Sequence, residues 1–191
     1  MDDTALIRAA QKGDVEAFNQ LVLKYQDLVY NHACATLGEP ELAEDITQEV
    51  FIKAYRGLGS FRGGSWRAWL LRIASNACYD EFRRRKKLAV APLVEISPDD
   101  EAFDLVSYPE NRGNPVEAHL EQVELRAAIQ RGLAGLPAEY RMAAVIIDLL
   151  GFDYAEAARS LGVPLGTVKS RLARARLGLR EYLNGALDLA G

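Results

Sequence analysis

The sequence is poor in cysteine and contains no long apolar run. Its only two cysteines, Cys34 and Cys78, are too few for a disulfide framework and lack the spacing of metal ligands. No stretch approaches the roughly 18 consecutive apolar residues that a membrane span needs. The amino terminus is acidic where a secretory signal would be basic and then apolar. We therefore expect a cytoplasmic protein that is neither secreted nor inserted into a membrane.

The composition is that of an ordinary folded protein. Of the 191 residues, 49% are apolar and 26% are charged, which excludes a disordered chain, a collagen and a coiled-coil fibre. At roughly 150 residues per domain, the length allows one domain or two small ones.

Charge is segregated along the chain, although the formal net charge is only −4. The whole acidic excess lies within residues 87–116, because the segments before and after it are each neutral. Residues 27–49 contain six acids and no base, Arg83 to Lys87 is an unbroken basic run, and residues 157–180 contain six bases and no acid. Such blocks indicate partners of opposite charge, although any one block is also compatible with a solvated helix face.

Helical periodicity dominates both ends of the chain. Apolar residues recur at three- and four-residue steps from Phe18 to Val29, and Asp14 is a suitable N-cap ahead of them. A second helix is expected from Pro40 to Gly57, because proline is favoured in the first turn. A third is expected from Trp66 to about Lys87, with an interruption near Asn76.

The middle of the chain differs from both ends. Residues 88–116 contain four of the seven prolines and most of the unbalanced acid, which is typical of a linker. No strand alternation and no internal repeat is evident. We therefore predict an all-α protein with two small helical domains, residues 1–87 and 117–191, joined by this acidic, proline-containing linker.

The carboxy-terminal half contains the pattern of a helix-turn-helix. An apolar helix over Tyr140–Leu150 precedes one that begins at Asp153, where Glu156 stands at the spacing of a capping box. A tight turn, Gly162–Pro164, and another helix, Thr167–Leu179, complete the pattern.

The last of these helices separates an apolar face from a polar one. Val168, Leu172, Ala175 and Leu179 fall on the side that must pack inward. A helix fits the major groove of DNA, where side chains donate to base edges and phosphates. The outward or flanking residues suited to this are Thr167, Lys169, Ser170, Arg171, Arg174 and Arg176. We predict that this half binds duplex DNA; an ordinary basic amphipathic helix is the alternative.

The helix expected over Pro40–Gly57 carries an acidic stripe. Asp45, Gln48, Glu49 and Ile52 share one face at i, i+3, i+4 and i+7 spacing. An isoleucine among acids indicates a docking surface for a basic partner, because charge steers the encounter while apolar area holds the complex. A merely solvated polar face is the alternative.

Seven short segments carry a family resemblance. In the amino-terminal half they are Ala43 to Phe51, Ser60 to Gly63, Trp69 to Asn76, and Arg83 to Lys87. In the carboxy-terminal half they are Leu136 to Arg141, Tyr154 to Ala158, and Gly162 to Leu172. The first set resembles the sigma-2 domain, and the second the sigma-4 domain, of bacterial extracytoplasmic-function (ECF) sigma factors of the sigma-70 superfamily. The resemblance covers roughly residues 5–87 and 117–184, in the family's order.

The resemblance implies a promoter-specificity subunit of RNA polymerase, active in a stress response, that is not an enzyme and uses no cofactor or metal. Asp45, Gln48, Glu49 and Ile52 would contact the clamp of the largest polymerase subunit, and the flap of the second subunit would be a further contact. Sigma-2 would melt and hold the minus-ten element of promoter DNA, while sigma-4 would read the minus-thirty-five element as duplex. An anti-sigma factor is an expected partner.

Melting requires a replacement for the stacking that an extruded base gives up. Stacking on an aromatic side chain contributes about 1–3 kcal/mol per base, and asparagine supplies both a donor and an acceptor. With the resemblance, this gives the expected minus-ten residues: Phe61, Trp66, Arg72, Asn76, Tyr79, Arg83 and Arg84. Trp69 is expected mainly in the core, and Asn76 could alternatively cap a helix end. The loop from Gly63 to Trp66 is one residue shorter than in many members, which affects the edge of the melting surface.

Two other classes of protein are weighed against this interpretation. A metal enzyme is disfavoured, because His32 and Cys34 point to different helix faces and no nucleophile–base pair or phosphate loop can be assembled. The second is an ordinary helix-turn-helix regulator whose amino-terminal half binds a ligand or partner. Copurification with core polymerase distinguishes a sigma factor from an ordinary regulator, because a sigma factor binds the core without DNA and an ordinary regulator need not.

Overall fold

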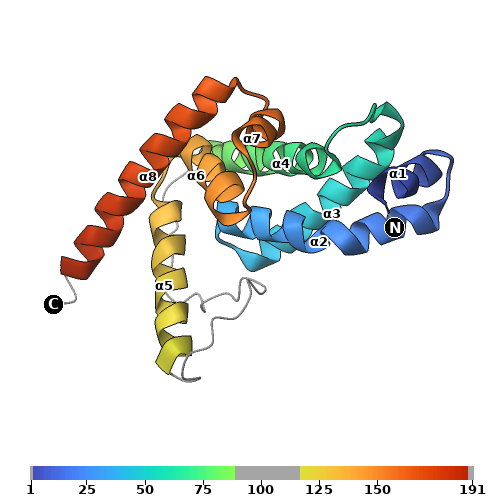
Figure 1. Cartoon of the computed structure of the whole chain (residues 1–191). Coiled ribbons are helices and arrows are strands. Elements are labelled where there is room, and N and C mark those ends of the chain that lie inside the picture. Colours follow the sequence, from blue (N-terminus) through green and yellow to red (C-terminus); the bar gives the residue numbers. More distant parts are fainter. Residues whose placement is uncertain (1, 89–116, 189–191) are drawn as a thin grey trace.

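The computed structural model describes residues 2–88 and 117–188, in which every regular element is a helix or helical turn (Figure 1). The amino-terminal half comprises α1 (Asp3–Gln11), α2 (Val15–Leu37), α3 (Pro40–Gly57), the 3-10 turn η1 (Leu58–Ser60) and α4 (Trp66–Leu88). The carboxy-terminal half comprises α5 (Glu117–Ala134), α6 (Ala138–Ala144), the π-helical turn η2 (Val145–Leu149), α7 (Tyr154–Leu161) and α8 (Leu165–Asp188).

The all-α class is confirmed. The linker predicted over 88–116 lies outside the described residues, apart from Leu88 at the end of α4. None of the helices described is long and apolar enough to cross a membrane.

Local sequence accounts for the limits of α2 and α3. Asp14 caps α2 by accepting a hydrogen bond from the Ala17 amide over 3.1 Å. Gly38 ends α2 with a φ of 80°, a left-handed conformation that favours glycine. Pro40 then opens α3 in the first turn, where the missing N–H costs nothing. The bounds predicted for α3 are confirmed.

The helix α4 is continuous, and the predicted interruption near Asn76 is wrong. Residues 66–88 contain neither glycine nor proline, so nothing in the backbone chemistry stops the helix. Asn76 is exposed in the middle of α4 and does not cap a helix end. The alternative interpretation of Asn76 as a terminal cap is therefore excluded.

Helices α2, α3 and α4 form the core of the amino-terminal half. Their fully buried side chains include Leu21 and Val29 of α2, Val50 of α3 and Leu70 of α4. The helix α1 lies along α2, and Gln11 at its end donates to the carbonyls of Leu58 and Phe61 over 3.0 and 2.9 Å. This contact braces the segment that joins α3 to α4.

The predicted helix-turn-helix is present as α7 and α8. Asp153 caps α7 by accepting from the Glu156 amide over 2.7 Å, and Gly162 ends it with a φ of 65°. The inward face of α8 is confirmed, because Val168, Leu172 and Ala175 are buried. However, α8 begins two residues before the expected Thr167 and continues to Asp188. The single helix expected over Tyr140–Leu150 is instead α6 followed by the π-helical turn η2.

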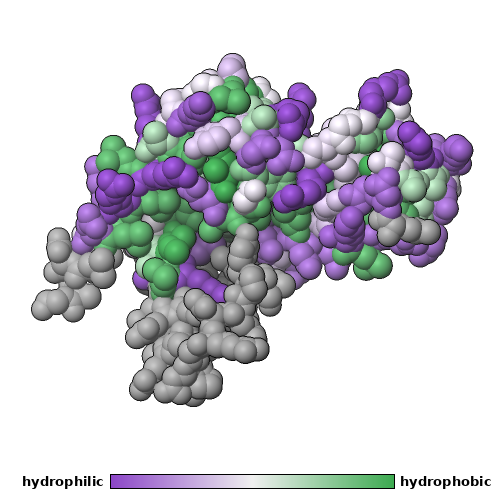
Figure 2. Space-filling model, in the orientation of Figure 1, coloured by the Kyte–Doolittle hydropathy of each residue, from purple (hydrophilic) through white to green (hydrophobic). Residues whose placement is uncertain are grey.

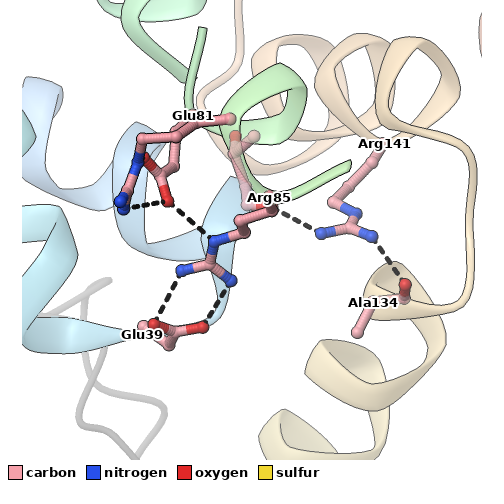
Figure 3. A network of polar contacts seen from close by, with 7 residues as sticks. Glu39, Glu81, Arg85, Ala134 and Arg141 are labelled. Atoms are coloured by element: carbon pink, nitrogen blue, oxygen red, sulfur yellow. Dashed lines mark hydrogen bonds and ion pairs between the residues drawn. The ribbon is translucent and has the colours of Figure 1, made fainter. Parts of the chain in front are cut away.

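The two halves pack against each other, and Arg141 of α6 stands at their junction. Its guanidinium donates to the Thr36 carbonyl near the end of α2 over 2.6 Å, and to Ala134 and Leu136 over 2.5 and 3.1 Å (Figure 3). Burial lowers the pKa of Arg141, and no carboxylate among the described residues pairs with it. Cations are favoured at helix carboxyl ends, where carbonyls lack partners. One side chain thereby satisfies carbonyls from both halves.

A histidine is buried where α2 meets α4. The Nε2 atom of His32 lies 3.1 Å from the Ser75 hydroxyl, and the ring is fully buried. Burial lowers the pKa of His32 to about 4, because water no longer stabilises the imidazolium. The folded chain therefore keeps this ring neutral near pH 6, where the unfolded chain binds a proton.

The stability of the amino-terminal half should fall as the pH drops from about 6.5 towards 4. The unfolded His32 binds a proton in this window that the folded one excludes, which costs up to about 3 kcal/mol. His32→Gln cannot titrate and should remove that contribution. Denaturant unfolding followed through Trp66 and Trp69, the only tryptophans, measures it. Parallel pH profiles for the two proteins would contradict the assignment.

Candidate polymerase-binding and DNA-binding surfaces

The acidic stripe predicted on α3 lies on the surface. Asp45, Gln48, Glu49 and Ile52 are all exposed, and Ile52 retains 51% of its accessible surface. The opposite face of α3 supplies Ile46, Val50 and Ala54 to the core. Glu49 is paired with Lys53 over 2.6 Å, so the carboxylate of Asp45 is the less neutralised of the two. The exposed Tyr55 extends the stripe beyond Ile52.

The helix α2 contributes to the same surface, which the sequence interpretation missed. A shallow groove of about 300 Å³ is lined by Gln26, Asp27 and Tyr30 of α2 and by Glu44, Thr47 and Gln48 of α3. Asp27 and Tyr30 are three residues apart and begin the base-free segment. That spacing was the available signal, because it places both on one side of α2. Acids from two helices therefore face one groove.

A second, larger cavity lies at the loop between η1 and α4. It measures about 490 Å³ and is lined by Ser60, Phe61, Arg62, Gly63, Gly64, Ser65, Ala68, Trp69, Arg72 and Arg159. Three of these side chains are guanidinium groups and two are aromatic. Gly63 and Gly64 have φ values of 102° and 95°, which a residue with a Cβ adopts only under strain. The two glycines thus permit the loop to curve around the cavity, which is called the loop pocket below.

The two tryptophans show the reverse of the expected exposure. Trp66 is only 3% exposed, whereas Trp69, expected mainly in the core, is partly exposed and lines the loop pocket. Phe61 is also buried and packs against both rings at centroid distances of 5.2 and 5.3 Å. In this arrangement, Trp66 offers no free face on which a base could stack. Trp66 is buried because it lies on the same face of α4 as Leu70, one turn further on, and this face points into the core.

The other predicted minus-ten residues lie along α4. Arg72, Asn76 and Arg83 are exposed at steps of four and seven, so they form one stripe. Tyr79 is half-buried beside that stripe, where burial raises the pKa of its hydroxyl. The stripe begins at the loop pocket, because Arg72 belongs to both.

Much of the charge in the basic run is neutralised by acids (Figure 3). The carboxylate of Glu81 accepts from Arg84 over 2.7 and 2.8 Å and from Arg85 over 2.8 Å. Arg85 also forms a two-bond pair with Glu39 over 2.6 and 2.8 Å. The Arg84 guanidinium, followed by Arg85, holds the pKa of Glu81 below its ordinary value despite burial. Arg83, 3.6 Å from Asp80, is the more available cation.

The predicted minus-thirty-five residues lie along α8 with different partners. Arg174 donates to the Tyr140 hydroxyl over 2.7 Å, and Arg176 pairs with Asp148 over 2.6 Å. Lys169 and Ser170 are exposed, while Thr167 and Arg171 are half-buried. The guanidinium of Arg171 lies close to the Tyr79 hydroxyl of α4, so it faces the amino-terminal half. The four exposed residues therefore form the accessible part of this set.

An apolar surface between α5 and α8 was not predicted from the sequence. Leu125 of α5 and Leu177 and Tyr182 of α8 are exposed by 56%, 54% and 37%, and Figure 2 shows apolar side chains on the side of the molecule where these two helices lie. Gly132 of α5 lies against Leu179 and Tyr182, which fixes the contact between the two helices. Solitary exposed apolar residues are common, but a group on adjoining helices indicates a partner.

Comparison with known proteins identifies both halves. Residues 21–88 match the family description Sigma-70 region 2, and residues 126–179 match Sigma-70, region 4. The chain is 38% identical over 191 residues to the ECF RNA polymerase sigma factor SigM of Mycobacterium tuberculosis, covering 98% of this chain and 89% of that protein. It is 36% identical to the ECF RNA polymerase sigma-E factor of Escherichia coli K12, covering 92% and 91%.

A solved structure agrees with these matches. The sigma factor RpoE of Bartonella quintana, crystallised with the anti-sigma factor NepR, superposes with a TM-score of 0.66 at 28% identity, covering 87% of this chain and 96% of that one. Sigma-70 regions 2 and 4 are therefore both present in order, and the likeness extends over nearly the whole length. The chain belongs to the ECF RNA polymerase sigma factors of the sigma-70 family.

Proposed function

We propose that this sigma factor assigns its three tasks to three separate surfaces. The acidic stripe of α3 binds core polymerase, the loop pocket with the α4 stripe captures melted minus-ten DNA, and the exposed face of α8 reads duplex DNA. The observation that carries the proposal is the separation of charge. Acids face outward on α3, whereas arginines without an acidic partner among the described residues line an aromatic pocket at the start of α4. The alternative of an ordinary regulator is not favoured, because sigma-70 region 2 is matched over 68 residues.

Docking on polymerase combines charge with apolar contact. Asp45 and Asp27 attract a basic partner, and Ile52 and Tyr55 supply apolar area beside them. We assign this surface to the clamp of the largest polymerase subunit. The apolar surface of Leu125, Leu177 and Tyr182 suits an apolar segment, and we assign it to the flap of the second subunit.

Capture of the melted strand is assigned to the loop pocket. An extruded base needs a stacking surface and new hydrogen-bond partners, and its phosphates need cations. The partly exposed Trp69 supplies the ring, and Arg62 and Arg72 supply charge. Asn76 lies one helical turn beyond Arg72 on the exposed stripe and can bond a base edge. Trp69 replaces Trp66 in this proposal because Trp66 is buried.

The remaining features of the proposal concern partners and chemistry. We infer an anti-sigma partner, since the RpoE structure similar to this chain contains one. The chain itself performs no covalent step, because polymerase carries out the synthesis, and it acts in the cytoplasm where the polymerase is. Among the described residues, no group of histidine, cysteine or acidic side chains could hold a metal ion.

Reversing the charge of the α3 stripe should weaken binding to core polymerase. Asp45→Lys with Glu49→Lys replaces attraction by repulsion, and both sites are exposed, so helicity should be unchanged. We expect the double variant to be lost from core polymerase in pull-down assays. Asp2→Lys with Glu16→Lys makes the same change in net charge at exposed positions away from both proposed docking surfaces, and serves as the control. Equal recovery of all three proteins would refute the docking assignment.

Removal of Asn76 should impair the opening of DNA more than its recognition. Asn76→Ala deletes the side-chain donor and acceptor but suits the helix. The holoenzyme with this variant should initiate poorly on paired promoter DNA. It should recover partly on a template premelted at the minus-ten element, where the cost of unpairing is already met. Trp69→Ala should behave likewise. Equal defects on both templates would place strand capture elsewhere.

The cations of α8 should fall into two classes. Lys169→Ala is expected to weaken binding to all duplexes and to lower the slope of affinity against salt by about one unit. Arg174→Ala should relax preference for one base, at a cost of about 1–3 kcal/mol at that position. Holoenzyme selection from a randomised promoter library measures both effects. A uniform loss for both variants, with unchanged preference, would leave only phosphate contacts on this helix.

A further inference from the structure

One side of the loop pocket is supplied by the other half of the same chain. Arg159 of α7 lines the pocket together with residues of α4 and the preceding loop. Beside it, the buried hydroxyl of Ser160 donates to the Ala68 carbonyl of α4 over 3.2 Å. In Figure 1, α7 lies across α4 near the amino-terminal end of that helix. The pocket is therefore a junction between the two domains.

The side chain of Glu156 forms a second tie at the rim of the pocket. In a capping box, a glutamate at this position returns to the backbone N–H of the capping residue. Here Asp153 accepts from the Glu156 amide, but the Glu156 carboxylate instead accepts from the Ser65 hydroxyl over 3.2 Å. Ser65 belongs to the loop that forms the pocket. The Glu156 carboxylate is thus bound to the pocket loop, where a strand of DNA would approach the arginines that line the pocket.

Apolar packing supports these polar ties. Leu71 of α4 is fully buried among Ile146, Phe152 and Ala157 of the carboxy-terminal half. The guanidinium of Arg67 lies 4.1 Å from the centroid of Phe152. Fully buried leucine at such a contact indicates a specific interface, since side chains on a free helix face remain accessible.

The same contact between the two halves covers part of α8, the helix proposed to read duplex DNA. The guanidinium of Arg171 in α8 lies close to the Tyr79 hydroxyl of α4, although one is an expected minus-thirty-five residue and the other an expected minus-ten residue. Two surfaces assigned to different promoter elements therefore face each other. Neither can accept DNA fully while they remain in contact.

We propose that the chain inhibits itself when free. The α7 helix, through Glu156, Arg159 and Ser160, occupies the rim of the loop pocket, and single-stranded minus-ten DNA competes with α7 for that rim. The competition rests on the function proposed for the pocket, whereas the closure itself does not. Residues 89–116 could span up to about 90 Å if extended, so their length permits the halves to separate.

The test uses two variants whose charges change in opposite directions. Glu156→Lys places a cation among Arg62, Arg72 and Arg159, and Ser160→Asp places an anion against the Ala68 carbonyl. Both should open the interface. Glu156→Gln and Ser160→Ala are the matched controls, because the glutamine oxygen can still accept from Ser65 and the alanine adds neither charge nor bulk to the buried contact. Circular dichroism verifies that each protein is folded.

Three measurements on the free, full-length chain detect separation of the two halves. The radius of gyration from X-ray scattering should rise by several ångström in both variants. Quenching of tryptophan fluorescence by acrylamide should rise, because Trp69 lines the pocket that Arg159 leaves when the halves separate. Affinity for a fluorescein-labelled single-stranded oligonucleotide of random sequence should also rise severalfold in both. A direct effect of charge on DNA would instead act in opposite directions in the two variants.

The outcomes separate closure from the function of the pocket. If both folded variants keep the wild-type radius and quenching, the closure is refuted. If they open but bind the oligonucleotide no better than the controls, the competition is refuted, and the pocket loses its assigned role in strand capture. In either case, transcription by the holoenzymes of these variants tests the sigma-factor function independently.

Discussion

The arrangement depends on α4 being buried from two sides. Leu70 and Ala74 face the core of the amino-terminal half, while Leu71, one residue on, faces the carboxy-terminal half. Only a narrow stripe of α4 remains exposed, and it carries Arg72, Asn76 and Arg83. The packing of Leu70 and Ala74 against the amino-terminal core does not depend on the other half, so the strand-capture surface that we propose on α4 stays preorganised when the halves separate.

Which arginines lack an acidic partner determines where this protein can attract DNA. Glu81 neutralises most of Arg84 and Arg85, and Asp148 does the same for Arg176. Arg72 and Arg159 have no such acid among the described residues, and both line the loop pocket. A formal net charge of −4 is therefore compatible with DNA binding, because the accessible field is set locally.

Local chemistry made the helices predictable from the sequence. Asp14, Pro40 and Asp153 each act on neighbouring backbone groups, and all three begin helices as expected. The acidic stripe and the inward face of α8 followed from helical spacing alone. The family was also evident, because its motifs are contiguous segments. These features require no knowledge of distant contacts.

The features that escaped prediction depend on contacts between distant residues. The burial of Trp66 and the partial exposure of Trp69 depend on how the start of α4 is set against the core, which the sequence pattern alone does not give. The carboxylate of Glu156 bonds Ser65, which is 91 residues away, so a local capping rule could not foresee it. The adjacent pair Leu70 and Leu71, which point to different faces of one helix, was a signal that α4 packs on two sides.

Hydrogen–deuterium exchange of the chain, free and bound to core polymerase, tests the central claim most directly. The account predicts that α3 becomes protected on binding, while α7 and the loop from residue 62 to residue 65 exchange faster, because the halves separate. Unchanged exchange in α3 would contradict the assigned docking surface. Equal exchange of α7 and the loop in both states would contradict a closed free form that opens on polymerase.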